Sequence, residues 1–205
     1  MAITNYGELK TAVADWLNRD DLTSVIPTFI DLAVAKMNRR LRTREMITRS
    51  TANVTTQYTK LPGGFLSMRN IQLNVSTPKS LEFLSVEQMD QERALGNTAR
   101  EPVYYTIIGD TIEVFPSPDA SYEIELAYYK TLPALSADAD TNWLLTKAPD
   151  AYLYGALLQA APYLKDTAET SLWLQAHDMV VNELEIENEK AIYGGSTIKA
   201  RHRTF

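Results

Sequence analysis

Hydrophobic residues recur at helical spacing near the start of the chain. The first apolar run predicts an amphipathic helix through Leu9, Val13, Trp16 and Leu17. Asn5 and Glu8 precede this run in a pattern that resembles a capping box. A second helix is predicted behind a Ser24 cap, with Pro27 in its first turn. Its apolar face comprises Ile26, Phe29, Ile30, Ala33, Met37 and Leu41.

The same spacing returns toward the C-terminus, beyond a segment rich in Pro and Asp at Leu132 to Asp140. Pro149 favours the start of a helix, and Pro162 is expected to end or bend it. A last helix is predicted from about Thr167 to Tyr193, where the pair Gly194-Gly195 stops it. The apolar positions of these two helices are Leu153, Tyr154, Leu157, Leu158 and Ala161, followed by Ala168, Leu172, Ala176, Met179, Val180 and Leu184.

Between the two helical regions, from Thr48 to about Lys130, the pattern is typical of strands. β-branched and aromatic residues become frequent, and Gly and Pro separate short alternating runs. Gly109-Asp110 supplies the backbone freedom that a tight hairpin needs. One short helix is predicted at Val86 to Leu95, behind a Ser85 cap with Gln88 three residues later. The predicted strands are Thr51 to Thr56, Arg69 to Val75, Val103 to Ile108, Thr111 to Phe115 and Tyr122 to Tyr129.

These patterns predict an α+β fold. The N-terminal and C-terminal helices are expected to pack together as a helical bundle, with a mostly antiparallel β region inserted between helices that are neighbours in space. We therefore expect a helical domain with a C-terminal tail, formed by residues 1–47 and 131–205, and an inserted β-rich domain formed by residues 48–130.

The composition limits the possible functions. With 205 residues, of which 45% are hydrophobic, the chain can build a core of its own. The absence of Cys excludes disulfides, thiolate metal sites and cysteine nucleophiles. We expect neither secretion nor membrane insertion, because the start of the chain lacks a signal-peptide pattern and no apolar run reaches about 18 residues.

Charge is unevenly distributed along the chain. The net charge of -6 disfavours a protein that coats nucleic acid with its whole surface. One basic cluster nevertheless contains a single acid, Glu45. Two interpretations stay open: a solvent-exposed helix face, or a surface that contacts phosphate or an acidic partner. The cluster comprises Lys36, Arg39, Arg40, Arg42, Arg44 and Arg49.

Few residues could support catalysis. His177 and His202 are the two histidines, so a His-based triad or a zinc cluster has almost nothing to be built from. Asp138, Asp140 and Asn142 imitate the first half of a calcium loop, but the Gly that such a loop requires next is missing. The sequence contains no glycine motif for binding phosphate. We therefore expect no catalytic, cofactor-binding or metal-binding residues.

The N-terminal helices carry a combination of residues that is typical of one family. The combination consists of Tyr6, Leu9, Val13, Trp16, Leu17-Asn18-Arg19, Asp21-Leu22, Ile26-Pro27, Phe29-Ile30, Leu32-Ala33 and Asn38-Arg39-Arg40-Leu41-Arg42. On these residues the chain resembles the head-to-tail adaptors of short-tailed phages, relatives of the tail tubular protein A adaptors. The helix that opens at Pro149 adds a weaker similarity. One departure is Val34, where such proteins are expected to have Glu.

The resemblance implies a structural virion protein, not an enzyme, that needs no cofactor. It implies a homo-oligomeric ring, a dodecamer, that joins the portal protein to the tail nozzle protein after assembly in the host cytoplasm. Genomic DNA would pass through the ring without sequence specificity, and the basic cluster would face the channel or a partner.

The last residues of the chain are basic and contain no acid. We predict that they dock on the portal as an arm, because new contacts can offset the entropy cost of ordering such a segment. A frayed terminus is the alternative. The segment comprises Ser196, Thr197, Ile198, Lys199, Ala200, Arg201, His202, Arg203, Thr204 and Phe205.

Three other functions stay open. The chain could be another phage neck or head-completion protein. A nucleic-acid-binding regulator would use the region from Arg39 to Arg49, although the net negative charge and the large β insertion fit that function poorly. An enzyme is the least supported alternative, because no nucleophile, metal or cofactor motif stands out.

Overall fold

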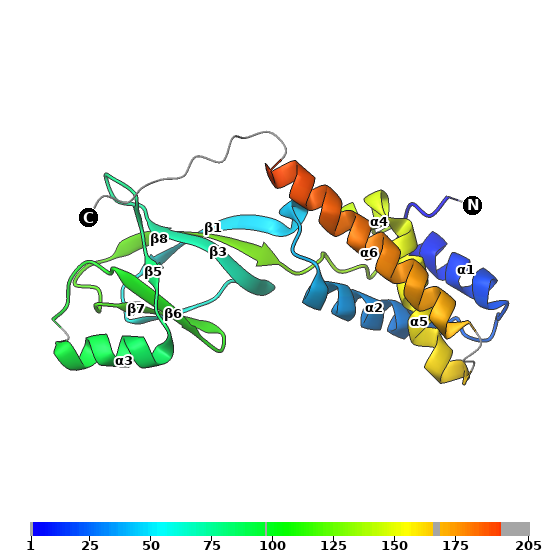
Figure 1. Cartoon of the computed structure of the whole chain (residues 1–205), viewed down its shortest axis with the longest axis horizontal. Coiled ribbons are helices and arrows are strands. Elements are labelled where there is room, and N and C mark those ends of the chain that lie inside the picture. The colour runs from blue at the N-terminus through cyan, green and yellow to red at the C-terminus, as the bar shows by residue number, and fades with distance from the viewer. Residues whose placement is uncertain (1, 97, 166–168, 194–205) are drawn as a thin grey trace. The chain divides into compact units, whose positions relative to one another are not determined.

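The computed structural model describes residues 2–96, 98–165 and 169–193. The chain divides into two compact units (Figure 1). Residues up to Glu45 and from Leu132 onward form the first, which we call the helical unit, and Met46–Thr131 form the second, the β-rich unit. The chain contains both α-helices and mostly antiparallel sheets, so the predicted α+β fold is confirmed.

The first helix begins and ends at polar residues that satisfy its terminal backbone groups. α1 spans Tyr6–Leu17, and the Asn5 side chain accepts a hydrogen bond of 2.9 Å from the Glu8 N–H, as predicted. Asn18 follows the helix in the left-handed conformation, with φ of 49°. Asn tolerates this conformation better than most residues, which explains why the helix ends there.

The second helix begins without a side-chain cap. α2 spans Ile26–Arg40, with Pro27 in its first turn as predicted. The predicted Ser24 cap is wrong, because Val25 occupies the cap position and no side chain bonds to the first turn. A backbone turn takes its place, in which the Val25 N–H donates to the Leu22 carbonyl oxygen at 2.8 Å.

Three helices follow the return of the chain to the helical unit. α4 spans Trp143–Lys147 and was not predicted, whereas α5 spans Pro149–Leu164 and α6 spans Thr170–Tyr193. Pro162 neither starts nor stops α5, which continues to Leu164 and ends at Lys165 in the left-handed conformation. Pro162 lacks the N–H of a helical hydrogen bond, and α5 ends two residues after it, at Leu164.

The core of the helical unit is shared by helices from both ends of the chain. α5 packs against α1, α2 and α6. Trp16 of α1 and Trp173 of α6 are in edge contact, and both rings touch the Tyr154 ring of α5. The large buried side chains include Leu9, Val13, Ile26, Ile30, Met37, Leu41, Leu144, Leu145, Tyr152, Leu157, Val181 and Leu184.

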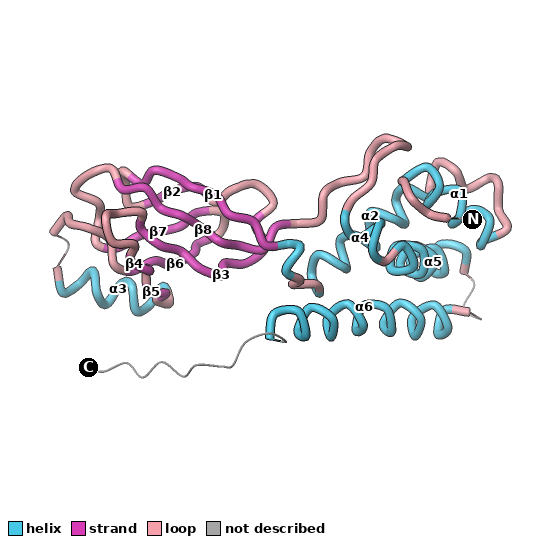
Figure 2. Tube along the Cα trace, turned by 90° about the horizontal axis from the view of Figure 1, so that it is seen from above, coloured by secondary structure: helices cyan, strands magenta, loops and turns pink. Residues whose placement is uncertain are grey.

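Small residues on α5 allow the neighbouring helices to approach closely. A Cβ atom on Gly155 would lie 3.0 Å from the Ala33 Cβ of α2 and 3.3 Å from the His177 ring of α6. Gly155 therefore lies where both α2 and α6 pack closely against α5. Figure 2 shows α6 running along one side of the helical unit.

The β-rich unit contains two four-stranded sheets. Neighbouring strands pair antiparallel, except that β5 and β6 pair parallel. The first sheet, in spatial order, comprises β1 (Ile47–Val54), β8 (Tyr122–Lys130), β3 (Phe65–Leu73) and β4 (Lys79–Ser80). The second comprises β2 (Tyr58–Lys60), β7 (Thr111–Phe115), β6 (Tyr104–Ile108) and β5 (Glu82–Phe83).

Local sequence signals set the hairpin and the helix of this unit. Gly109 has φ of 61° in the turn between β6 and β7, which confirms the predicted hairpin. α3 spans Val86–Leu95 and begins with a capping box formed by Ser85 and Gln88, also as predicted. The helix buries Met89 and packs against β6.

Side chains from both sheets form one hydrophobic core. A partly buried ion pair lies beside it, in which the buried Glu113 of β7 accepts from Arg93 of α3 and, at 2.7 Å, from the Gln57 amide. This pair fixes α3 to the second sheet. The core comprises Val54, Ile71, Leu73, Leu81, Tyr105, Ile112, Val114, Ile124, Leu126 and Tyr128.

The close approach at Gly155 makes a testable prediction. Gly155→Leu should lower the free energy of unfolding by about 1–3 kcal/mol, because a side chain there overfills the contact between α5, α2 and α6. Gly63→Leu is the control, since a Cβ at Gly63 meets nothing within 4 Å. Urea denaturation measures both variants. Equal losses in the two would contradict this account of the helix packing.

Candidate functional site

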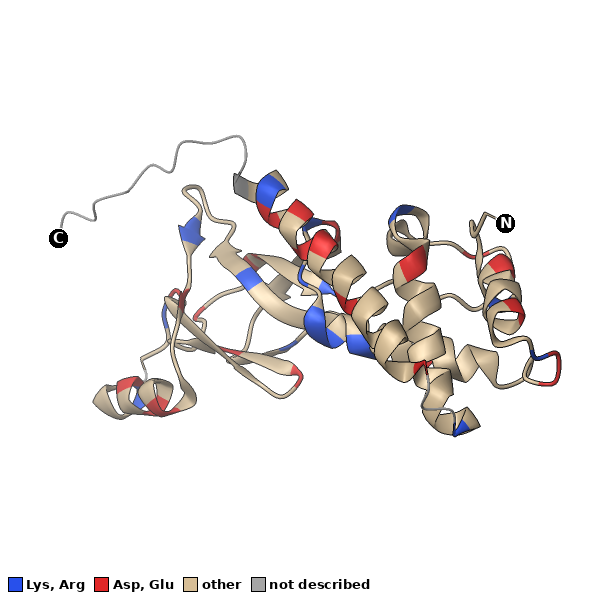
Figure 3. Ribbon diagram, turned by 45° about the vertical axis from the view of Figure 1, so that its right-hand side comes forward, with Lys and Arg blue, Asp and Glu red and all other residues tan. Residues whose placement is uncertain are grey.

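The predicted basic cluster begins in the last turns of α2 and continues past its end. Arg39 and Arg40 occupy the last turn, where positive charge is favoured by the helix dipole. Arg44 starts a short 3₁₀ helix, η1, which spans Arg44–Met46. Figure 3 shows the acidic residues along α6 and the basic residues at the end of α2. The ion pairs between these acids and bases therefore determine which cations of the cluster remain available to a partner.

Arg40 is engaged by α6 within the same unit. Its guanidinium donates to Asp178 at 2.6 Å, to Glu185 at 3.2 Å and to the Asn182 amide oxygen. Asp178, Asn182 and Glu185 lie on consecutive turns of α6, so the planar guanidinium bridges them along one flank. Arg40 thus joins α2 to α6.

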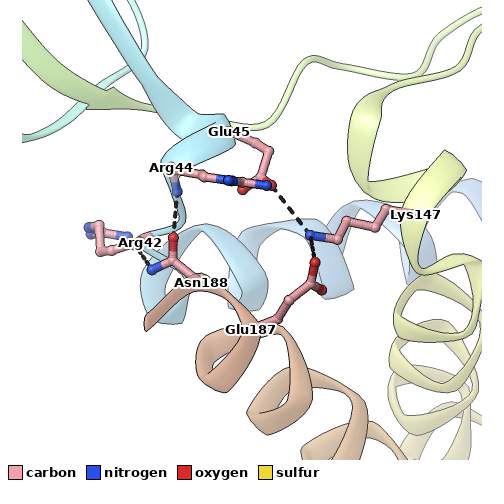
Figure 4. Close-up of polar contacts among 6 residues, drawn as sticks. All are labelled: Arg42, Arg44, Glu45, Lys147, Glu187 and Asn188. Atoms are coloured by element: carbon pink, nitrogen blue, oxygen red, sulfur yellow. Dashed lines mark hydrogen bonds and ion pairs between the residues drawn. The ribbon is translucent and has the colours of Figure 1, made fainter. Parts of the chain in front are cut away.

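Arg42 and Arg44 form hydrogen bonds where the chain leaves α2 and passes α6, a place that we call the junction (Figure 4). The Arg42 guanidinium donates to the Asn38 carbonyl oxygen at 2.7 Å, which satisfies a carbonyl at the end of α2. The Asn188 side chain of α6 accepts from the Arg44 N–H at 2.8 Å and donates to the Arg42 carbonyl oxygen at 3.3 Å. One asparagine therefore fixes the chain segment that leaves α2.

Lys147 of α4 lies between two acids at this junction (Figure 4). Its ammonium is 2.9 Å from Glu187 and 3.3 Å from Glu45, and the hydrogen bond to Glu187 is the main reason why the pKa of Lys147 is raised. Burial acts to raise the pKa of Glu45. A hydrogen bond from its own backbone and those from Arg44 and Lys147 outweigh burial, so the Glu45 pKa lies below its usual value.

Arg49 belongs to the β-rich unit and does not join this junction. It lies on β1 and forms an ion pair with Glu125 of β8, one diagonal step away on the same face of the sheet. Of the six predicted cations, Arg40, Arg42 and Arg44 are thus used inside the helical unit, and Arg49 is used inside the other.

Lys36 and Arg39 differ from the other four cations of the cluster, which are used inside the two units. Both are exposed, and neither forms an ion pair with any residue that the structure describes. They are the members of the predicted cluster that remain available to bind phosphate or an acidic protein surface. The predicted arm from Ser196 to Phe205 lies outside the described residues.

His177 is buried in the helical core, where it contacts Gly155. Burial lowers its pKa below the usual 6.5, Asp178 opposes this effect, and Arg40 and Lys36 add to it. Its Nε2 atom has no hydrogen-bond partner among the described residues. The imidazole therefore acts as a neutral packing residue between α6 and α5.

The aspartates of the imitated calcium loop have structural roles. Asp138 forms an ion pair of 2.6 Å with Lys10, and Asp140 accepts two backbone N–H bonds, those of Ser136 and Ala137. Asn142 caps α4 and is buried. In the part of the chain that is described, no group of three or more acids or histidines is placed to hold a metal ion.

Asn142 also fixes the packing of α5 through its side chain. Its amide donates to the Tyr152 hydroxyl at 2.8 Å and to the Pro133 carbonyl oxygen at 2.9 Å. Burial raises the pKa of Tyr152 to about 12, which keeps the hydroxyl neutral. These contacts hold the segment that re-enters the helical unit against α5.

A family model described as SU10 adaptor protein matches residues 4–198 of the chain. The chain belongs to the SU10 adaptor protein family. This is a family of phage head-to-tail adaptors, so the resemblance found in the N-terminal helices is confirmed. No curated protein matches the chain.

Membership in the SU10 adaptor family identifies the class of partners. A phage adaptor is a structural component of the virion and interacts with portal and tail components. None of the helices described here is both long and apolar enough to cross a membrane.

The network around Arg40 predicts a difference between neighbouring arginines of this SU10 adaptor. Arg40→Met should lower the free energy of unfolding by about 1 kcal/mol more than Arg39→Met, because partly exposed ion pairs contribute about 0.2–1 kcal/mol each. Both residues lie in the last turn of α2, so the helix-dipole effect cancels in the comparison. Urea denaturation gives both values. If Arg39→Met costs as much, the Arg40 contacts do not stabilise the fold.

The buried His177 predicts acid sensitivity. Between its lowered pKa and 6.5, the unfolded chain binds the proton more readily, so stability falls as the pH drops through this window. The melting temperature of the wild type should decrease more than that of His177→Gln between about pH 7.5 and pH 5.5. His202 is present in both proteins and cancels. Parallel pH profiles would show that His177 is not the group responsible.

Proposed function

We propose that this chain assembles as a homo-oligomeric ring, a dodecamer, that joins the portal protein to the tail nozzle protein and continues the DNA channel between them. The family match over residues 4–198 carries this proposal. A channel that lets genomic DNA pass needs no base recognition, so binding to DNA is expected to be independent of sequence. Assembly takes place in the host cytoplasm, without catalysis or a cofactor.

The helical unit is suited to act as the rigid body of such a ring. We propose that the helical unit and the β-rich unit are two separate domains. Both connections to the β-rich unit start from fixed points at the end of α2. Asn188 holds the Arg44 N–H at 2.8 Å, and the Asn38 side chain accepts from the Leu132 N–H at 2.9 Å. Both contacts lie inside the helical unit and fix its chain segments on either side of the β-rich unit.

The alternative within the same class is another phage neck or head-completion protein. The two functions differ in what the chain binds. An adaptor forms a ring on the portal and then recruits the tail nozzle protein, whereas a head-completion protein binds the head without recruiting the nozzle protein. Electron microscopy of the chain mixed with portal, and then with nozzle protein, distinguishes them. A chain that stays monomeric alone and on the portal would overturn the ring.

The basic C-terminal segment is proposed as the arm that docks on the portal. Deleting Ser196 to Phe205 should abolish binding to the portal while the melting temperature stays unchanged. A full-length variant with Lys199→Ser, Arg201→Ser and Arg203→Ser keeps the length of the segment and removes its positive charges. We expect this variant to bind the portal weakly. Binding of the wild type should itself weaken as salt is added, because ions screen charged contacts. Co-sedimentation with portal measures both. Normal docking of the deletion variant would refute the arm.

A further inference from the structure

The outward face of α6 carries apolar side chains at a regular spacing. Leu172, Met179 and Ile186 follow one another every seven residues, and they are 56%, 56% and 51% exposed. Seven residues correspond to two turns, so these side chains form one stripe along the helix. An exposed apolar stripe of this kind is a feature of protein interfaces. The stripe lies away from the buried side of α6, which carries His177, Val181 and Leu184.

A groove of about 350 Å³ lies between this stripe and α5. Its apolar lining consists of Tyr154 of α5 and of Leu172, Ala176, Met179 and Val180 of α6. Two acids, Asp150 and Glu183, also line it. Neither acid forms an ion pair with a residue in the described ranges, so the groove combines an apolar floor with two negative charges that lack an ion-pair partner.

The outer face of α2 has the complementary character. Leu32 is 49% exposed, and Lys36 and Arg39 follow it four and seven residues later on the same side of the helix. Both cations lack an ion pair among the residues described, as shown above. This face therefore presents one apolar side chain beside two positive charges that have no ion-pair partner among the described residues.

The two surfaces lie on different flanks of α6. Arg40 binds α6 through Asp178, Asn182 and Glu185. The groove uses Leu172, Met179 and Glu183, which lie roughly a third of a turn further round the helix at about 100° per residue. The α2 face cannot fill the groove of its own chain. Two different complementary patches on one rigid unit are what a head-to-tail contact requires. Such contacts form a ring when the rotation between subunits closes, and an open filament when it does not.

We propose that the groove between α5 and α6 of one subunit receives the outer face of α2 from the next subunit. Leu32 packs on the apolar floor, and Lys36 and Arg39 pair with Asp150 and Glu183. This inference rests on the proposed ring and names the surface that closes it. A second copy of the chain is the occupant, because both halves of the contact are present on every subunit.

Disulfide cross-linking tests the contact directly, since the chain contains no Cys. The variant Leu32→Cys with Met179→Cys should form head-to-tail multimers on oxidation, as a ladder on a non-reducing gel. A mixture of the two single variants is the matched control and should stop at dimers. A mobility shift without a ladder means an intramolecular bond and overturns the proposal, as does the absence of any cross-link in a ring that has formed.

Charge reversal tests the pairing independently. Lys36→Glu with Arg39→Glu should abolish the ring, and so should Asp150→Lys with Glu183→Lys. All four changes in one chain should restore it, because each subunit supplies both sides. Lys165→Glu with Lys190→Glu alters the charge equally at exposed positions outside both patches and should leave the ring intact. Native mass spectrometry gives the subunit number, and thermal melting confirms that each variant is folded.

The outcomes separate this interface from the ring itself. A wild-type chain that remains monomeric alone and on the portal overturns both. A wild-type ring that persists in both reversed pairs overturns only the interface, as does a four-fold variant that stays dissociated. If the ring of Lys36→Glu with Arg39→Glu stays intact but no longer retains DNA, these cations face the channel, and the subunit contact lies elsewhere.

Discussion

The structure depends on the contact of α5 with helices from the other end of the chain. α5 is buried over most of its surface, and its small residues at 151, 155, 156 and 160 let α2 and α6 come close. At Gly155 an added Cβ atom would meet Ala33 and His177 at 3.0 to 3.3 Å. Because the apolar faces of α1 and α2 are covered by helices that follow the β-rich unit, the two ends of the chain cannot form stable cores separately.

Local sequence signals predicted the elements that local interactions determine. The Asn5 cap, the Ser85 capping box and the hairpin at Gly109 each depend on residues a few positions apart, and each appears as expected. The short elements α4, β2, β4 and β5 were missed, since two to five residues are too few to show a period. The Ser24 cap was wrong because a backbone turn competes with a serine side chain for the same N–H groups.

The contacts of the candidate site could not be predicted from the sequence, because they join residues that are far apart along the chain. The basic cluster was visible as a run, but its composition could not reveal that Arg40 binds acceptors more than 130 residues away. The acidic positions of the last helix, such as Glu185 and Glu187, were the available signal. A run of acids on one helix and a run of bases on another suggest pairing only once the two helices are known to be neighbours. Within the predicted basic cluster, the structure leaves Lys36 and Arg39 without an ion pair among the described residues.

The insertion of one unit into the other has a consequence for synthesis on the ribosome. The β-rich unit is continuous in sequence, so it can fold as soon as it emerges, and domains generally fold in this order during translation. α1 and α2 emerge earlier but must wait for α5 and α6, which leaves their apolar faces uncovered throughout that interval. When many copies are made at once, another chain's α5 can occupy that face first, and chaperones that shield nascent helices reduce this exchange of elements between subunits.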